Sequence, residues 1–220
     1  TTAVTRISEL GLSSSVVKFV AKYLAREDLK SAAGVVQTAM ISVAILVGLI
    51  LLLAYPFSDW LLGLVVPAEE IDAALSILPY ALVSLFITLI TSVVQSGLDG
   101  CQRVDLRSVT QMGASVFHLL VSLALTPLYG LKGLAYAHVI QSAVVVVTSW
   151  WLLGKTLKIL PSIPYQWDQE LFKEMLGYGI NSQVVSAVRM LYEPTTMALL
   201  SRFAGLAAVG YFQMARRMVS

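Results

Sequence analysis

The sequence has little charge and almost no cysteine. Only 13% of its 220 residues are charged and 57% are hydrophobic, whereas soluble domains carry about a quarter charged residues. The single Cys101 excludes an internal disulfide framework and a cysteine-based zinc site. The sequence also lacks a Gly-rich phosphate loop, a nucleophile elbow and an HExxH pattern. We therefore expect no cofactor and no catalytic or metal centre.

The small basic excess gives no reason to expect nucleic-acid binding. The formal net charge is only +2, and the basic residues fall in the connections between apolar stretches, not in a basic patch. His118 and His138 each stand alone in an apolar stretch. A solitary histidine in a helix is more often a hydrogen-bonding neighbour than a metal ligand, so neither residue indicates a site.

Charge is missing altogether from four long stretches. A transmembrane helix needs roughly 20 apolar residues to cross the hydrocarbon core, and backbone polar groups in lipid must be satisfied within the segment. The sequence therefore predicts an all-α polytopic membrane protein. The four stretches without Asp, Glu, Lys or Arg are 32–55, 73–98, 108–131 and 133–154.

Two further spans are less regular. Residues 175–201 are long enough to cross a membrane, but they contain Arg189, Glu193 and Pro194. Residues 12–24 resemble the last part of a helix that begins at or before Thr1. We expect the sequence to be a fragment of a longer protein, with about one helix before it and several after it.

The basic residues alternate from one connection to the next. The connection at 56–72 has no Lys or Arg, and the one at 126–132 has only Lys132. Because Lys and Arg are enriched in cytoplasmic loops, the side with the basic connections should be cytoplasmic. The residues on that side are Lys18, Lys22, Arg26, Lys30, Arg103, Arg107, Lys155, Lys158 and Lys173.

Aromatic residues and prolines mark the ends of these spans. Phe57, Trp60 and Leu61 beside Asp59 predict a short interfacial helix on the outer surface. Trp150 and Trp151 occupy an aromatic-belt position at the cytoplasmic end of their span. The stretch 161–167 (PSIPYQW) cannot continue a helix because of its prolines. We interpret it as the linker between two helical bundles.

Charges within the membrane are costly and therefore usually paired or functional. Arg6 and Glu9 are three residues apart on one helical face, and they form either a static ion pair or part of a central site. Lys18 and Lys22 are four apart on one face of the same helix. They are either anchors whose side chains reach the membrane surface or direct contacts for an anionic head group.

A polar stripe follows one face of the predicted helix at 175–201. Its spacing places the members on a single face that lipid would reject, so the stripe should face a bundle interior or a water-filled cavity. Pro194 adds a predicted hinge. The alternative is a static buried pair of Arg189 and Glu193. The stripe consists of Asn181, Ser182, Ser186, Arg189 and Glu193.

Several segments resemble a known family of exporters. Residues 9–25 (ELGLSSSVVKFVAKYLA) resemble its second helix, and 126–135 (TPLYGLKGLA) resemble the tight outer turn between its fifth and sixth helices. Residues 171–180 (LFKEMLGYGI) resemble the start of its seventh helix, followed by 200–205 (LSRFAG) and 208–212 (AVGYF). Together they resemble the polysaccharide biosynthesis (O-antigen) flippases of the multidrug/oligosaccharidyl-lipid/polysaccharide (MOP) exporter superfamily.

The resemblance implies two bundles of six or more helices around a cavity that opens alternately to either side. Residues 1–160 would then be helices two to six of the first bundle, 161–170 the cytoplasmic linker, and 171–220 the seventh helix and the start of the eighth. The cargo would be an oligosaccharide on a polyprenyl diphosphate, flipped outward across the cell membrane. Basic cavity groups would attract the diphosphate, and a polysaccharide polymerase is an expected partner. The candidates are Arg189, Arg6, Lys18 and Lys22.

Three other functions remain open. A drug or metabolite exporter and a lipid-linked peptidoglycan precursor flippase belong to the same superfamily. A membrane-embedded transferase acting on a polyprenyl substrate would need carboxylates or His at the membrane surface. The available carboxylates are solvated loop charges without a partner His, so we do not expect an enzyme. They are Asp59, Glu69, Glu70 and Asp72.

Overall fold

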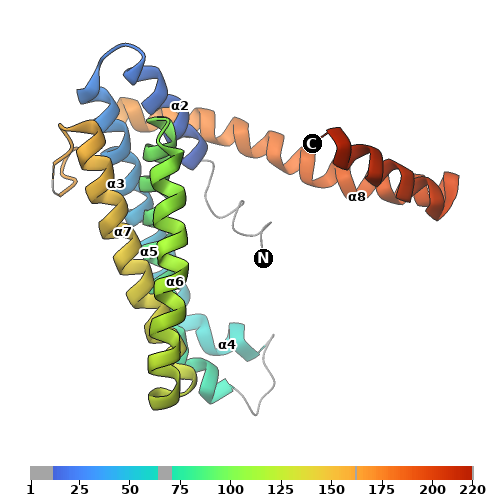
Figure 1. The fold of residues 1–220 in the computed structure, drawn as a ribbon, viewed down its shortest axis with the longest axis horizontal. Helices are drawn as coiled ribbons and strands as arrows, with labels where there is room; N and C mark the ends of the chain where they lie inside the picture. The colour runs from blue at the N-terminus through green and yellow to red at the C-terminus, as the bar shows by residue number, and fades with distance from the viewer. Residues whose placement is uncertain (1–11, 64–70, 162, 220) are drawn as a thin grey trace. The chain divides into compact units, whose positions relative to one another are not determined.

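The computed structural model describes residues 12–63, 71–161 and 163–219, without the side chains at 59–61, 187, 189–191, 193–194, 204, 206–208 and 216–219. Every regular element in these ranges is a helix (Figure 1), which confirms the all-α expectation. The elements are α2 (Leu12–Leu24), α3 (Leu29–Ala54), η1 (Tyr55–Phe57), α4 (Ser58–Gly63), α5 (Ile71–Gly100), α6 (Val104–Tyr129), α7 (Leu131–Leu157) and α8 (Gln169–Val219).

The four predicted spans are confirmed as helices long and apolar enough to cross a membrane. Their limits agree with the charge-free stretches to within about one helical turn. The small differences arise because charged residues can form the last turn of a helix and extend their side chains to the membrane surface. The short helix predicted after the first span is also present, as η1 and α4. The candidate spans are Leu29–Phe57, Ile71–Gly100, Val104–Tyr129 and Leu131–Leu157.

Turn residues set the limits of the helices. Asp28 caps α3 by accepting hydrogen bonds from the Ser31 amide at 3.0 Å and the Ser31 hydroxyl at 2.6 Å. These bonds favour the charged carboxylate, so they hold the pKa of Asp28 below its ordinary value. Between α6 and α7, Gly130 adopts a φ of 57° and a ψ of −134°, a conformation that only glycine adopts readily. The chain therefore reverses there within a single residue.

The buried core lies at the end of the bundle where α2 meets α3. It joins Val16 and Val20 of α2 to Val36 of α3, Leu98 of α5 and Leu153 of α7. In contrast, α6 buries only Ala114, and its leucines at 119, 120 and 123 are exposed. Such surfaces suit lipid or further helices of the same protein, because an apolar face of this size is not stable in water.

Small residues allow close helix crossings. A Cβ on Gly97 would approach Leu153 Cδ2 to 3.0 Å, and one on Gly100 would approach Val20 Cβ to 2.7 Å. Lipid tails are as apolar as leucine, so helix association in a membrane depends on such packing and on hydrogen bonds, more than on the hydrophobic effect. The contacts of α5 with α2 and α7 are therefore stabilised mainly by close backbone approach.

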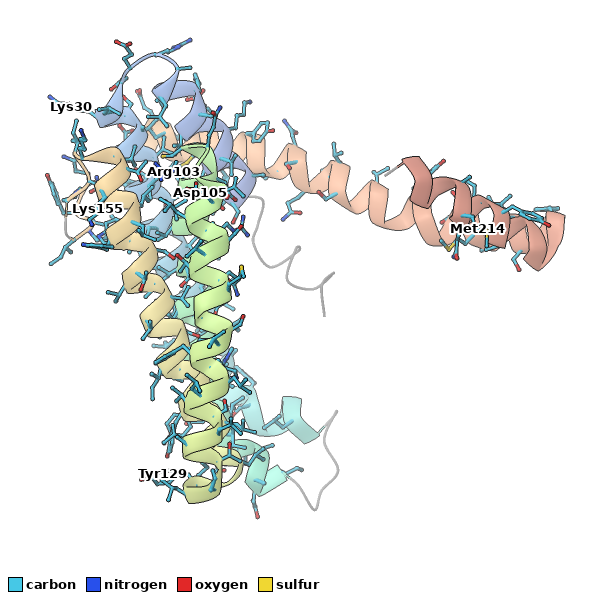
Figure 2. All side chains as sticks on the ribbon, viewed as in Figure 1. Lys30, Arg103, Asp105, Tyr129, Lys155 and Met214 are labelled. Carbon is cyan, nitrogen blue, oxygen red and sulfur yellow. The ribbon has the colours of Figure 1, made fainter. Side chains whose placement is uncertain are left out.

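Basic residues from three alternate connections lie at one end of the bundle. Figure 2 shows Lys30, Arg103 and Lys155 at one end and Tyr129 at the other. At the basic end, Asp99 and Arg107 form an ion pair across the turn between α5 and α6. At the opposite end, the Tyr136 ring packs edge-on against Tyr80 at 4.8 Å. The helix ends thus have the alternation that the sequence predicts for successive crossings.

The chain forms two compact units, Thr1–Gly179 and Ile180–Ser220. Their boundary falls within α8, whose backbone leaves helical geometry at Gly205, with a φ of 80° and a ψ of 169°. The α8 backbone stays helical through Pro194, and the hinge predicted at that residue stays a prediction. The division into 1–160, 161–170 and 171–220 also stays a prediction.

Candidate functional site

The two lysines predicted on one helical face lie on α2, where it meets the start of α8. Lys18 Nζ is 3.8 Å from the centroid of the Tyr178 ring and 5.4 Å from that of Phe19. Lys22 Nζ is 5.1 Å from the Phe19 ring. A cation over an aromatic face is stabilised by about 0.5–1 kcal/mol at an exposed site. The rings therefore hold both ammonium groups along one edge of α2.

The two lysines differ in their acidic partners. Lys22 forms an ion pair with Glu174 at 3.0 Å. Both side chains are partly exposed, so this pair contributes little to stability. Lys18 is exposed, and in the part of the chain that the structure describes no carboxylate lies within ion-pair distance of it. Of the two, Lys18 is the cation better placed to accept an anionic ligand.

The first turns of α8 are fixed against α2 by polar and aromatic contacts. The buried Ser15 hydroxyl donates a hydrogen bond to the Met175 carbonyl at 2.8 Å. The Phe19 and Tyr178 rings pack edge-to-face with centroids 6.3 Å apart. Because Ser15 and Phe19 are four residues apart, they share the α2 face that also carries Lys18 and Lys22. Lys18, Phe19 and Lys22 of this face, with Glu174 and Tyr178 of α8, form what we call the lysine–tyrosine cluster.

The polar stripe of α8 is described only in part. Asn181 and Ser186 are exposed, Ser182 is half-buried, and the Ser186 hydroxyl donates to the Ser182 carbonyl of its own helix at 2.9 Å. The side chains of Arg189 and Glu193, and the proline ring proposed as a hinge, lie outside the described residues, as do Arg6 and Glu9. Their predicted roles stay predictions.

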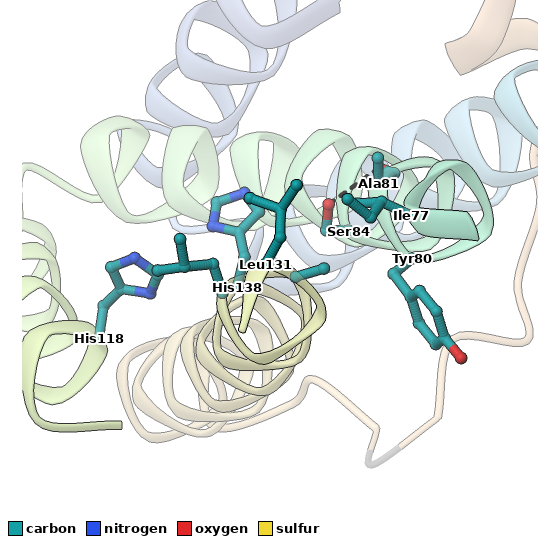
Figure 3. A pocket seen from close by; sticks show the side chains of 9 residues that line it. Ile77, Tyr80, Ala81, Ser84, His118, Leu131 and His138 are labelled. Carbon is teal, nitrogen blue, oxygen red and sulfur yellow. Dashed lines mark hydrogen bonds between the residues drawn. The ribbon is translucent and has the colours of Figure 1, made fainter. Parts of the chain in front are cut away.

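A pocket that the sequence does not indicate lies among α5, α6 and α7 (Figure 3). It has a volume of about 380 Å³, and its walls include His118, His138 and Tyr80. The two imidazole rings pack edge-to-face with centroids 5.7 Å apart, and His118 Nε2 is 3.4 Å from the Ser122 hydroxyl. The expectation of a hydrogen-bonding neighbour fits His118. The chain reversal at Gly130 returns α7 along α6, and the packing of these two helices places the rings side by side.

Polar residues of α3 bind the segment that enters α8. The Gln37 side-chain oxygen accepts hydrogen bonds from the amides of Tyr165 and Gln166, both at 3.3 Å. Thr38 Oγ1 accepts from the Asp168 amide at 3.1 Å, and Trp167 Nε1 donates to Ser42 Oγ at 3.0 Å. These polar side chains thus pair with an irregular segment, whose backbone amides have no helical partner and need acceptors.

The chain matches a known protein family but no curated protein. A family model described as polysaccharide biosynthesis protein matches residues 1–220. The family match therefore covers every element described above, including the lysine–tyrosine cluster.

Two solved transporter structures resemble the chain. One is the inward-facing conformation of a multidrug resistance MATE family transporter of the MOP superfamily, with a TM-score of 0.69 and 20% identity over 96% of this chain and 49% of that chain. The other is a MOP superfamily transporter from Pyrococcus furiosus, for which a binding pocket of reverse polarity suggests a different function. Its TM-score is 0.65 at 18% identity, covering 96% of this chain and 48% of that chain. The chain thus spans about half the length of these transporters and shares their fold.

Proposed function

The chain belongs to the polysaccharide biosynthesis protein family. On this basis we propose that the full-length protein flips a lipid-linked oligosaccharide outward across the cell membrane. The family match and the transporter fold both favour an exporter over an enzyme. The proposed cargo is an oligosaccharide on a polyprenyl diphosphate. The proposed location is the cell membrane, with the basic end of the bundle on the cytoplasmic side.

The observation that carries the choice of cargo is the lysine–tyrosine cluster. It presents an exposed ammonium, Lys18, over an aromatic ring at the basic end of the bundle. A diphosphate is a strong acceptor of hydrogen bonds from ammonium groups, and a sugar ring packs its apolar face well on tyrosine. An exporter of organic cations would be served better by free carboxylates than by a free lysine. The cluster therefore favours the anionic glycolipid.

The cluster also suggests how transport would begin. Lys18 lies on α2, and Tyr178 lies on the first turns of α8. A diphosphate bound by Lys18 would attract the ammonium away from the ring, and Lys22 would remain paired with Glu174. Rocking of two helical bundles about a central site is the general mechanism of such transporters. In the proposed mechanism, Lys18 receives the head group at the cytoplasmic side, and Arg189 is the proposed cation further along α8.

The test is transport by the full-length protein in a bacterial strain deleted for its polysaccharide flippase. Wild-type protein should move the lipid-linked sugar to the outer membrane face, scored by enzymatic accessibility of the sugar on each face. Lys18→Gln should reduce the rate about tenfold, the effect of losing one charge-assisted hydrogen bond. Lys18→Arg, which keeps the positive charge, should retain most of the wild-type transport rate. Arg189→Ala should abolish transport without loss of membrane insertion.

Lys30→Gln is the matched control, because Lys30 is also an exposed lysine at the basic end but lies outside the cluster. It should transport normally. Equal rates for Lys18→Gln and wild type would remove Lys18 from the path. Sugar left on the inner face by well-inserted wild-type protein would reject the proposed cargo and favour a drug or metabolite exporter. Transport of a lipid-linked peptidoglycan precursor alone would identify the protein as a peptidoglycan precursor flippase instead.

A further inference from the structure

An open apolar groove, which shares no residue with the lysine–tyrosine cluster, lies at the basic end of the bundle. It is formed by α3, the last turns of α7 and the segment that follows α7, and it has a volume of about 610 Å³. Its walls include Met40, Val147, Leu160 and Ile163. Val147 is 67% exposed and Ile163 is 74% exposed. The groove is therefore open on one side, so a molecule in the surrounding medium can enter it.

The groove has a cationic rim. Lys155 lines it, and Lys155 Nζ is 3.5 Å from the centroid of the Trp151 ring. The ring holds the ammonium at the mouth of the groove by a cation–π contact. Lys158 lies three residues further on and is exposed. No Asp or Glu lines the groove among the residues that the structure describes, so its charge is uncompensated.

The distribution of apolar and charged groups matches the depth of a membrane interface. From Lys155 to Val147 the helix rises about 12 Å, from the charged rim into the apolar part of a candidate span. Trp151 lies between them, and tryptophan is enriched at the level of lipid head groups. A ligand for this groove therefore needs an anionic group at the rim and hydrocarbon below it.

We propose that this groove binds an anionic glycerophospholipid, with its phosphate at Lys155 and an acyl chain along Met40 and Val147. Basic pockets between helices at a cytoplasmic surface suit such head groups. The groove shares no residue with the lysine–tyrosine cluster, and the proposal does not depend on the cargo. Leu160, Pro161, Ile163 and Pro164, from the segment that follows α7, form one wall. That segment enters α8, so a bound lipid stabilises this connection.

A single glycine offers a sharp test. Gly154 lines the groove, and a Cβ there meets nothing within 4 Å. Gly154→Leu would place a side chain in the space of the acyl chain, while helix propensity favours leucine over glycine. Gly113→Leu is the matched control, because a Cβ at Gly113 also meets nothing within 4 Å and that residue lies on α6, outside the groove.

The experiment measures phosphatidylglycerol and phosphatidylcholine retained by purified full-length protein, by native mass spectrometry during lipid titration. Wild-type protein and Gly113→Leu should retain phosphatidylglycerol preferentially. Gly154→Leu should lower that retention about tenfold. Lys155→Gln should lower it about fivefold, the effect of one basic residue near an anionic surface, and leave phosphatidylcholine unchanged. Millimolar inorganic phosphate should not compete, since it has no acyl chain.

Several results would overturn the proposal. Equal retention of the two lipids by wild-type protein would mean that the rim does not select charge. Normal retention by Gly154→Leu would mean that the groove is empty of lipid or filled by another part of the full-length protein. Displacement of phosphatidylglycerol by an equal amount of polyprenyl phosphate would assign the groove to the carrier lipid instead.

Discussion

At the scale of single residues, Cys101 shows how the bundle controls the chemistry of a side chain. It lies in the turn between α5 and α6 and is partly buried. Burial raises the pKa of its thiol from the ordinary 9.0 to about 11, because the charged thiolate loses solvation, while nearby Arg103 acts in the opposite direction. At neutral pH the thiolate population is therefore about a hundredfold smaller than for an unperturbed thiol.

Maleimide labelling tests this shift, because the thiolate is the reacting species. In a full-length variant with Cys101 as its only cysteine, labelling at pH 7 should be about a hundredfold slower than for a cysteine introduced at exposed Lys30 in a Cys101→Ser background. The rate should rise about tenfold per pH unit until the pH approaches 11. A plateau near pH 9 would show that the thiol is solvated.

The sequence predicts which residues lie together when they share one face of a single helix. Lys18 and Lys22 share a face because they are four residues apart. Their partners Tyr178 and Glu174 were not predictable, since they lie more than 150 positions away in the sequence. The meeting of His118 and His138 depends on how α6 and α7 pack against each other. No feature of either apolar stretch alone specifies that register.

At the scale of elements, the α6–α7 hairpin depends on close backbone contact. A Cβ on Gly133 would collide with the carbonyl oxygen of Leu125. Gly133→Ala should therefore destabilise the protein by about 1–3 kcal/mol, the range for overpacked sites. Thermal unfolding of the detergent-solubilised full-length protein measures the effect.

Gly113→Ala provides the comparison within the same hairpin. Its Cβ would meet nothing within 4 Å, and alanine favours helix over glycine by up to about 1 kcal/mol. Its midpoint should stay equal or rise. Similar midpoints for the two variants would refute the close contact at Gly133.

The spans were predictable because lipid imposes one dominant rule, the absence of charge over about 20 residues. That rule does not apply equally to α8, which carries charges and a proline within a long helical stretch. The break in α8 falls at Gly205, where a positive φ is needed. A kink at Pro194, expected because an interior proline removes a backbone hydrogen bond, stays a prediction.

At the scale of the whole molecule, the basic residues predict the orientation in the membrane. Lys30, Arg103 and Lys155 should face the cytoplasm, and Tyr129 should face the outside. Single cysteines at these four positions, in a Cys101→Ser background, test this with an impermeant thiol reagent. Cysteine at 129 should label in intact cells, and the other three only after permeabilisation. The opposite pattern would invert the orientation.

The hydrogen bonds of Gln37 and Thr38 to the segment at 165–168 have a consequence for protein engineering. The prolines at 161 and 164 look like a natural junction for exchanging halves between two homologous proteins. A junction there would separate backbone amides from the α3 side chains that accept their hydrogen bonds, leaving donors unpaired. A chimera joined after Asp168 keeps donor and acceptor from the same parent. In such chimeras, residues 159–168 and α3 should therefore come from the same parent protein.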